Sequence, residues 1–89
     1  MSVPDIATLV WDRDDDPEGN VQHVAAHGLT QRDVEDAFEN STGTGISRST
    51  GRPIVFGNTR TGRHIIVVYE EIDSTIAYPI TAYDVPQKK

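Results

Sequence analysis

The sequence predicts an α+β fold in which two helices pack on one face of a twisted, mostly antiparallel sheet of four to five strands. Apolar residues recur with helical spacing between residues 16 and 39, and with the two-residue period of strands from residue 46 onward. Helices that are separated in this way from a run of strands are typical of α+β domains. With 89 residues, of which 36% are hydrophobic, the chain can build one modest core, so we expect a single domain over residues 1–89.

The first part of the chain is expected to form a strand and a short helix. Residues 6–11 have the composition of a strand and lead into a loop rich in aspartate. Asp16 and Pro17 are expected to begin the helix, because aspartate caps helices and proline is favoured at the first helical position. The expected buried stripe of this helix is Val21, Val24 and Ala25. His27-Gly28 is expected to end it, since glycine adopts the left-handed conformation that closes helices.

A second helix is expected to begin at Thr30, whose hydroxyl can accept a hydrogen bond from the amide of Asp33. Its apolar stripe consists of Val34, Ala37 and Phe38. The polar residues expected to face water are Arg32, Asp33, Glu35, Asp36 and Glu39. Residues 40–45 are polar and rich in glycine, so we expect a turn there.

The remaining segments are expected to be antiparallel strands: 46–50, 53–59, 63–71 and 76–82. The composition of residues 59–62 is typical of a hairpin turn. Residues 65–68 are apolar on both faces, as expected for the central strand of the sheet. Pro79 cannot donate a hydrogen bond to a neighbouring strand, which predicts an edge or a bulge at that position.

The composition restricts the class of protein. The chain has no cysteine, which excludes disulfides, zinc–thiolate sites and a cysteine nucleophile. No apolar run approaches the roughly 20 residues needed to cross a bilayer, and the N-terminus lacks the pattern of a signal peptide. We therefore expect a cytoplasmic protein that does not associate with membranes.

Charge is distributed unevenly along the sequence. Residues 1–40 carry a net charge of −8, residues 41–69 carry +4 without a single carboxylate, and residues 70–89 carry −2. The basic centre contains Arg48, Arg52, Arg60, Arg63 and His64. Either these cations solvate the ends of a sheet, or they bind something anionic.

Short motifs are spread between Trp11 and Ala82. They are Trp11-Asp12, His27-Gly28-Leu29-Thr30, Val34 with Ala37 and Phe38, Arg52 with Val55, Phe56 and Gly57, Gly62-Arg63, residues 65–69, and Ile80-Thr81-Ala82. In their order and spacing they resemble the BrnT-like toxins of bacterial type II toxin–antitoxin systems, which have the RelE-type ribonuclease fold.

The resemblance implies a toxin that cleaves RNA without a metal or other cofactor and that a cognate antitoxin restrains. Such chemistry needs cations at a phosphate and a group that exchanges protons near neutral pH. The expected phosphate-binding residues are Arg48, Arg52, Arg60 and Arg63. If they hold RNA, the first three are expected to converge at one mouth of the sheet with at least one of Arg63 or His64. The expected catalytic residues are His64, Arg63, Arg52 and Tyr83, with His64 as acid or base. Tyr69 is an alternative proton donor. Expected partners are the antitoxin, RNA or a second copy of the chain.

Several observations favour a different class of protein. Ala26 and Tyr83-Asp84 stand where the family usually has a lysine and an arginine. Strand alternation also places Arg63 and His64 on opposite faces of the sheet, so they cannot both face one phosphate. The first alternative is a non-catalytic protein-binding domain of the same fold that has lost its nuclease residues. The second is a standalone binding domain of unknown ligand. His23 and His27 share a helix face, but no third ligand has suitable spacing, so we expect no metal site.

Overall fold

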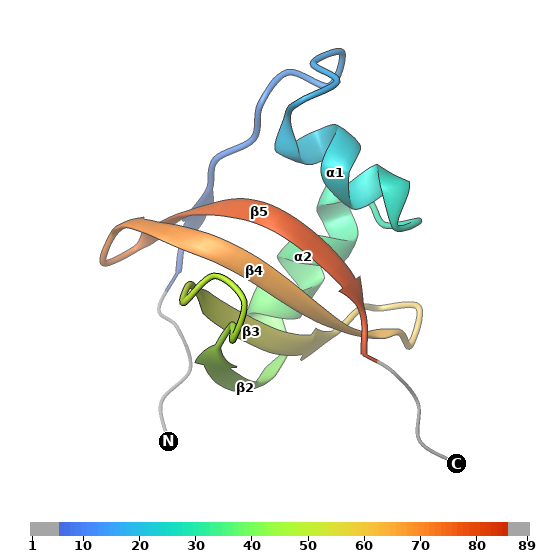
Figure 1. Cartoon of the computed structure of the whole chain (residues 1–89). Coiled ribbons are helices and arrows are strands. Elements are labelled where there is room, and N and C mark those ends of the chain that lie inside the picture. The colour runs from blue at the N-terminus through green and yellow to red at the C-terminus, as the bar shows by residue number, and fades with distance from the viewer. Residues whose placement is uncertain (1–5, 86–89) are drawn as a thin grey trace.

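The computed structural model describes residues 6–85, in which five strands form one sheet beside two helices (Figure 1). The elements are β1 (Thr8–Leu9), α1 (Asn20–Ala26), α2 (Gln31–Glu39), β2 (Ser41–Ile46), β3 (Pro53–Asn58), β4 (His64–Asp73) and β5 (Ile76–Asp84). The strand order is β1-β5-β4-β3-β2, with only β1 and β5 parallel. The predicted α+β fold is confirmed, and so is the central position of the strand that contains residues 65–69.

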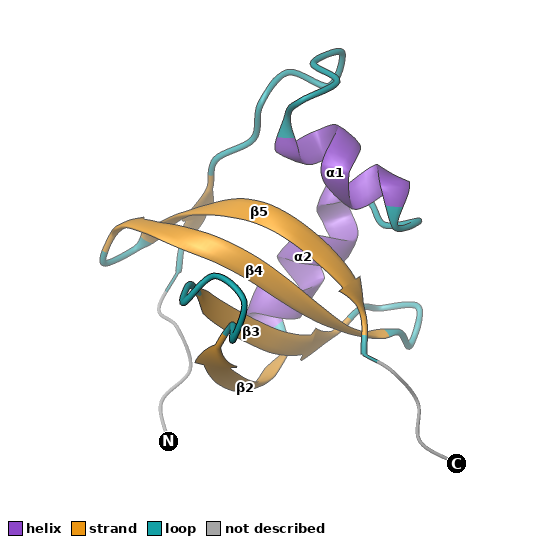
Figure 2. Cartoon of the chain, viewed as in Figure 1, coloured by secondary structure: helices purple, strands orange, loops and turns teal. Residues whose placement is uncertain are grey.

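The core lies between the helices and one face of the sheet, and Figure 2 shows α2 behind the strands and α1 beyond the edge of β5. The helices and the turn between them contribute Val24, Leu29, Val34, Ala37 and Phe38. The strands contribute Val55, Ile65, Val67, Tyr69, Ala77 and Ala82. The predicted stripe of α2 is therefore confirmed, whereas the predicted stripe of α1 reduces to Val24, because Val21 is half-buried and Ala25 is exposed.

Helix α2 approaches β3 closely at one glycine. A Cβ atom added to Gly57 would lie 2.7 Å from the Cα atom of Ala37, which is closer than real Cβ contacts allow. Only a residue without a side chain lets the helix backbone rest on the strand here. This contact fixes the position of α2 over β3.

The caps of the two helices agree only in part with the predictions. Thr30 and Asp33 form a reciprocal capping box at the start of α2, with N–O distances of 3.1 and 3.0 Å. Gly28 has a φ of +76°, as predicted for the residue that closes α1. The predicted start of α1 at Asp16 is wrong, because Asp16 accepts a hydrogen bond from the amide of Glu18 in a preceding turn. Asp12 instead accepts one from the first helical amide, that of Asn20, at 3.0 Å.

Two predicted strand boundaries are also wrong. Residues 41–46 form strand β2 and residues 47–52 form the loop after it, which reverses the turn and the strand predicted there. Gly43 and Gly45 lie opposite Phe56 and Ile54 in β3, so the large side chains lean over bare backbone. At the N-terminus, only Thr8 and Leu9 of the predicted strand pair with β5.

Strand β5 has the irregularity that Pro79 predicts. The register shifts between Val68–Thr81 and Tyr69–Pro79, which leaves Ile80 as the extra residue of a bulge. Helix α1 covers the edge of β5 beside it: the side-chain amide of Asn20 donates to the carbonyl of Pro79 at 2.8 Å, and His23 Nδ1 lies 3.4 Å from the carbonyl of Ile80. Neither of the described helices is long and apolar enough to cross a membrane.

Candidate functional site

The four arginines of the basic centre divide into two pairs. Arg48 and Arg52 lie in the β2–β3 loop, whereas Arg60 and Arg63 lie in the β3–β4 loop. These loops stand at opposite ends of β3, whose six residues span about 17 Å at the usual rise of a strand. His64 follows Arg63 at the same end of β3. The prediction that Arg48, Arg52 and Arg60 converge at one mouth of the sheet with Arg63 or His64 is therefore wrong.

Arg60 is bound to a buried carboxylate. Its backbone amide donates to Asp36 Oδ2 at 3.0 Å, and its Nε lies 3.3 Å from both carboxylate oxygens. The Asp36 side chain is only 1% exposed, so the prediction that it faces water is wrong. The amide of Arg60, followed by its guanidinium and that of Arg32, lowers the pKa of Asp36 below its ordinary value of 3.8. The pair anchors the β3–β4 loop to α2.

Each of the three guanidinium nitrogens of Arg63 donates a hydrogen bond to the chain itself. Nε donates to Asp84 Oδ1 at 2.9 Å, Nη2 donates to Asp84 Oδ2 at 2.7 Å, and Nη1 donates to the carbonyl of Gly28 at 2.8 Å. This two-bond geometry is the strongest form of an arginine–carboxylate pair. It lowers the pKa of Asp84 and raises that of Arg63. Arg63 thus joins the turn between the helices to the end of β5.

His64 lies on the other side of the sheet from Arg63. Its Nε2 atom is 3.2 Å from the hydroxyl of Thr42, and its ring centroid is 6.5 Å from that of Phe56. The predicted separation of Arg63 and His64 onto opposite faces is confirmed. The hydrogen-bond partner of the His64 ring among residues 6–85 is thus a neutral hydroxyl.

The two tyrosines predicted as proton donors, Tyr83 and Tyr69, have different surroundings. Tyr83 is 36% exposed, and its ring centroid lies 6.1 Å from that of His27. Tyr69 is buried against the ring of Phe38, at a centroid distance of 5.2 Å, and burial raises its pKa. Tyr69 is therefore a core residue, and of the two only Tyr83 can meet a ligand.

The β2–β3 loop contains the two unpaired arginines. Of the six arginines, all within the described part of the chain, Arg48 and Arg52 are the two that make no ion pair, and both are exposed. The loop also carries the hydroxyls of Ser47, Ser49 and Thr50. In Figure 1 it lies in front of β3, whereas α2 lies behind the sheet.

A second set of apolar side chains lies on the face of the sheet without helices. Residues that lie directly opposite each other on neighbouring strands point to the same face of the sheet. Two rows of such residues cross β3, β4 and β5 on this face. One row consists of Phe56, Ile66 and Tyr83, and the other of Ile54, Val68 and Thr81. Val68 is buried but does not belong to the core under the helices, and the rest of these side chains are half-buried or exposed. We call these six residues the helix-free face.

Sequence reasoning missed the partners that neutralise Arg60 and Arg63. The sequence pattern places Asp36 among the polar residues of a solvated helix face, although its carboxylate is buried. Asp84 stands out in the sequence only as part of Tyr83-Asp84, which follows Ala82 where the resembled family usually has an arginine. Nothing in the local sequence links either aspartate to its arginine, because the partners are 24 and 21 residues apart.

Comparisons with known proteins add no assignment to this arrangement. No family model, curated protein or solved structure matches the chain.

Within residues 6–85, no group of three or more histidine, aspartate or glutamate side chains is placed to hold a metal ion.

Proposed function

We propose that the chain is a non-catalytic protein-binding domain whose partner docks on the helix-free face. The observation that carries this proposal is the pair of cross-strand rows containing Ile54, Phe56 and Ile66, which lie outside the core under the helices. Tyr83 ends one of these rows, where its ring also contacts His27 at the end of α1. Aromatic and apolar side chains of this kind dominate the energetics of protein interfaces.

The surroundings of the expected catalytic residues support this class over a nuclease. Cleavage of RNA needs unpaired cations beside the group that transfers protons, because charge develops on the phosphate. Asp36 and Asp84 neutralise the arginines of the loop that precedes His64. Arg48 and Arg52, which are unpaired, lie at the far end of β3 from His64.

Charge defines the chemistry of the partner. Arg48 and Arg52 stand beside the helix-free face in the β2–β3 loop and carry its unpaired positive charge. A segment with apolar residues flanked by aspartate or glutamate complements both features, and such charge complementarity increases specificity and the rate of association. In the setting that the BrnT-like resemblance implies, this partner is a cognate antitoxin in the cytoplasm, and a second copy of the chain is the alternative.

A binding experiment with matched variants tests the proposal. The probe is the protein encoded by the neighbouring reading frame, co-expressed with the chain. Ile66→Thr is expected to weaken binding at least about tenfold, since it removes apolar area from the middle of a row. Ile72→Thr is the control, because Ile72 lies on the same strand and is 56% exposed outside the rows. Equal affinities of the two variants would contradict the proposed docking face.

A second candidate is the RNA-cleaving toxin, favoured by one specific observation. The β2–β3 loop combines two unpaired arginines, Arg48 and Arg52, with three hydroxyl side chains and no carboxylate. Cations and hydroxyls of this kind bind phosphate groups of nucleic acids. If the loop binds single-stranded RNA, the logarithm of the affinity should fall with the logarithm of salt concentration by about 0.7 per phosphate contact. The variant Arg48→Ala with Arg52→Ala should then lose both binding and growth inhibition.

A further inference from the structure

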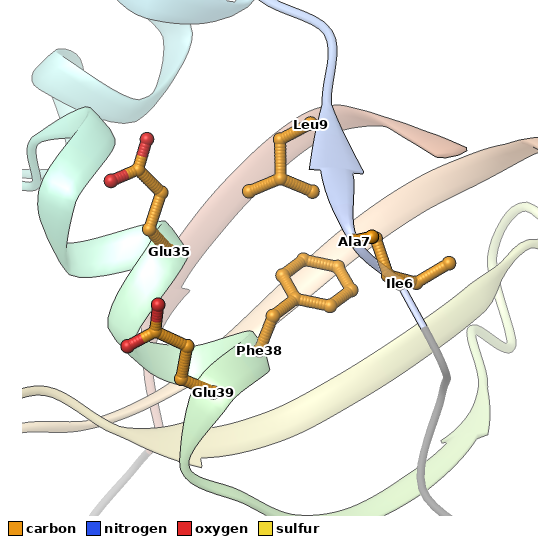
Figure 3. Close-up of a pocket in the computed structure, with 6 residues that line it drawn as sticks. All are labelled: Ile6, Ala7, Leu9, Glu35, Phe38 and Glu39. Carbon is orange, nitrogen blue, oxygen red and sulfur yellow. The ribbon is translucent and has the colours of Figure 1, made fainter. Parts of the chain in front are cut away.

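A pocket of about 170 Å³ opens between the N-terminal segment and α2. It is lined by Ile6, Ala7, Leu9, Glu35, Phe38 and Glu39. Figure 3 shows Phe38 extending from the helix toward the N-terminal segment, with Leu9 and Ile6 across from it and the two glutamates on the helix side. The pocket therefore has one apolar wall and one acidic wall.

The two glutamates have no positive partner nearby. Neither Glu35 nor Glu39 makes an ion pair with any described residue. Arg32, the arginine of α2 itself, is directed to Asp36 instead. Two like charges four residues apart on a helix repel each other and destabilise it slightly. A positive group bound in the pocket would relieve this repulsion.

The size and lining of the pocket select the kind of ligand. Pockets for drug-sized molecules and cofactors usually have about 300 to 1,000 Å³, so this pocket suits a single side chain. Lysine and arginine combine a long apolar stem with a charged end, and they bury the stem while the charge stays at the surface. Phe38 and Leu9 offer apolar surface for such a stem, and Glu35 and Glu39 offer carboxylates for its charge.

We propose that this pocket binds a lysine or arginine side chain of a partner protein. The stem would lie along Phe38 and Leu9, and the charged group would pair with Glu35 and Glu39. This inference rests on the proposed function, since it names a second contact for the same class of partner. The pocket is on the helix side of the sheet, so it is separate from the helix-free face and can be tested without it.

A titration followed by NMR tests the pocket with defined probes. The amide signals of the full chain are recorded while N-acetyl-arginine amide is added, and N-acetyl-norleucine amide serves as the uncharged control. We expect saturable shifts centred on Leu9, Glu35, Phe38 and Glu39 for the arginine probe alone. Shifts that are absent, or equal for both probes, would overturn the proposal.

Matched variants separate the pocket from general attraction to an acidic surface. Replacing the pocket pair, Glu35→Gln with Glu39→Gln, should weaken arginine binding about tenfold. Replacing Glu70 and Glu71 with glutamine removes the same charge from exposed positions on β4 and should leave binding unchanged. Equal losses in the two variants would show non-specific attraction and overturn the proposal. Arginine binding that requires removal of residues 1–5 would also overturn it, because the chain's own N-terminal segment would then be the occupant.

Failure of this inference is distinguishable from failure of the proposed function. If Ile66→Thr still binds the partner, docking on the helix-free face is contradicted, whereas the result of the arginine titration stands. If the titration gives no specific shifts, binding of a basic side chain in the pocket is contradicted, whereas a loss of partner binding in Ile66→Thr stands.

Discussion

Arg63 and Asp84 form an ion pair through two parallel hydrogen bonds, of 2.9 and 2.7 Å, while the third donor of Arg63 reaches the carbonyl of Gly28. The pair links the turn between the helices to the last strand. It has a direct consequence for function, because a guanidinium that is already paired in this way has little capacity left for a phosphate.

Replacing Arg63 should therefore affect stability. Arg63→Ala is expected to lower the melting temperature by several degrees, since it leaves the Gly28 carbonyl and Asp84 without their donor. Arg63→Lys should recover only part of the loss, because an ammonium cannot form both parallel bonds. Arg48→Ala is the control, as Arg48 is exposed and makes no ion pair. Equal melting temperatures for the Arg48→Ala and Arg63→Ala proteins would contradict this assignment.

Stability should fall in acid because of three aspartates. The pKa values of Asp12, Asp36 and Asp84 are all lowered in the folded chain, by the Tyr78 hydroxyl, by the Arg60 amide and by the Arg63 guanidinium respectively. Each carboxylate contributes stability above its ordinary pKa of 3.8, and this is lost as the pH falls through the lowered value. Thermal unfolding between pH 2 and 7 should show this decline. In Asp36→Asn the decline should be smaller, and an unchanged pH profile would contradict the contribution of Asp36.

Gly57→Ala should destabilise the domain by about 1–3 kcal/mol, the usual cost of overpacking a core. The added methyl group would press on the backbone of Ala37 and push α2 away from β3. Gly45→Ala is a matched control, because a Cβ there would meet only ordinary contacts at 3.5 Å with Ile54. Chemical denaturation of the two variants measures the difference. If Gly45→Ala cost as much as Gly57→Ala, the close approach of the helix would not be the cause.

Tyr78 should ionise late in an alkaline titration. Its hydroxyl donates to Asp12, and this bond, together with burial, raises the pKa of Tyr78 to about 12. The protonated hydroxyl therefore stabilises the fold below the ordinary pKa of 10, and this contribution is lost as the pH rises through about 12. Ultraviolet absorbance of tyrosinate should show a step near pH 12 that is lost in Tyr78→Phe, while the raised ionisation of Tyr69 remains. Persistence of the step near pH 12 in that variant would assign it to another tyrosine.

The fold was predictable where local rules decide the structure. The capping box of Thr30 and Asp33, the apolar stripe of α2 and the left-handed Gly28 all follow from sequence spacing. Strand β2 could not be predicted from its own sequence, because its glycines are typical of a turn. These glycines make room for the side chains of Ile54 and Phe56 on the neighbouring strand β3.

The candidate site was less predictable because its decisive features are tertiary. Which arginines are neutralised depends on Asp36 and Asp84, which come from other elements of the fold. The distance between the two arginine pairs depends on the hairpins at either end of β3. The sequence predicts the strand before β3 at residues 46–50, whereas β2 occupies Ser41–Ile46. The opposite sides of Arg63 and His64 could be predicted, since strand alternation is a local rule.

The central claim is that the chain binds a protein and does not cleave RNA, and cleavage of a fluorogenic single-stranded RNA by the purified chain tests it most directly. The wild-type protein should leave the RNA as intact as the His64→Ala and Arg48→Ala/Arg52→Ala variants do, under conditions in which a known ribonuclease cleaves it. Cleavage by the wild-type chain that is lost in these folded variants would contradict the account and establish the nuclease.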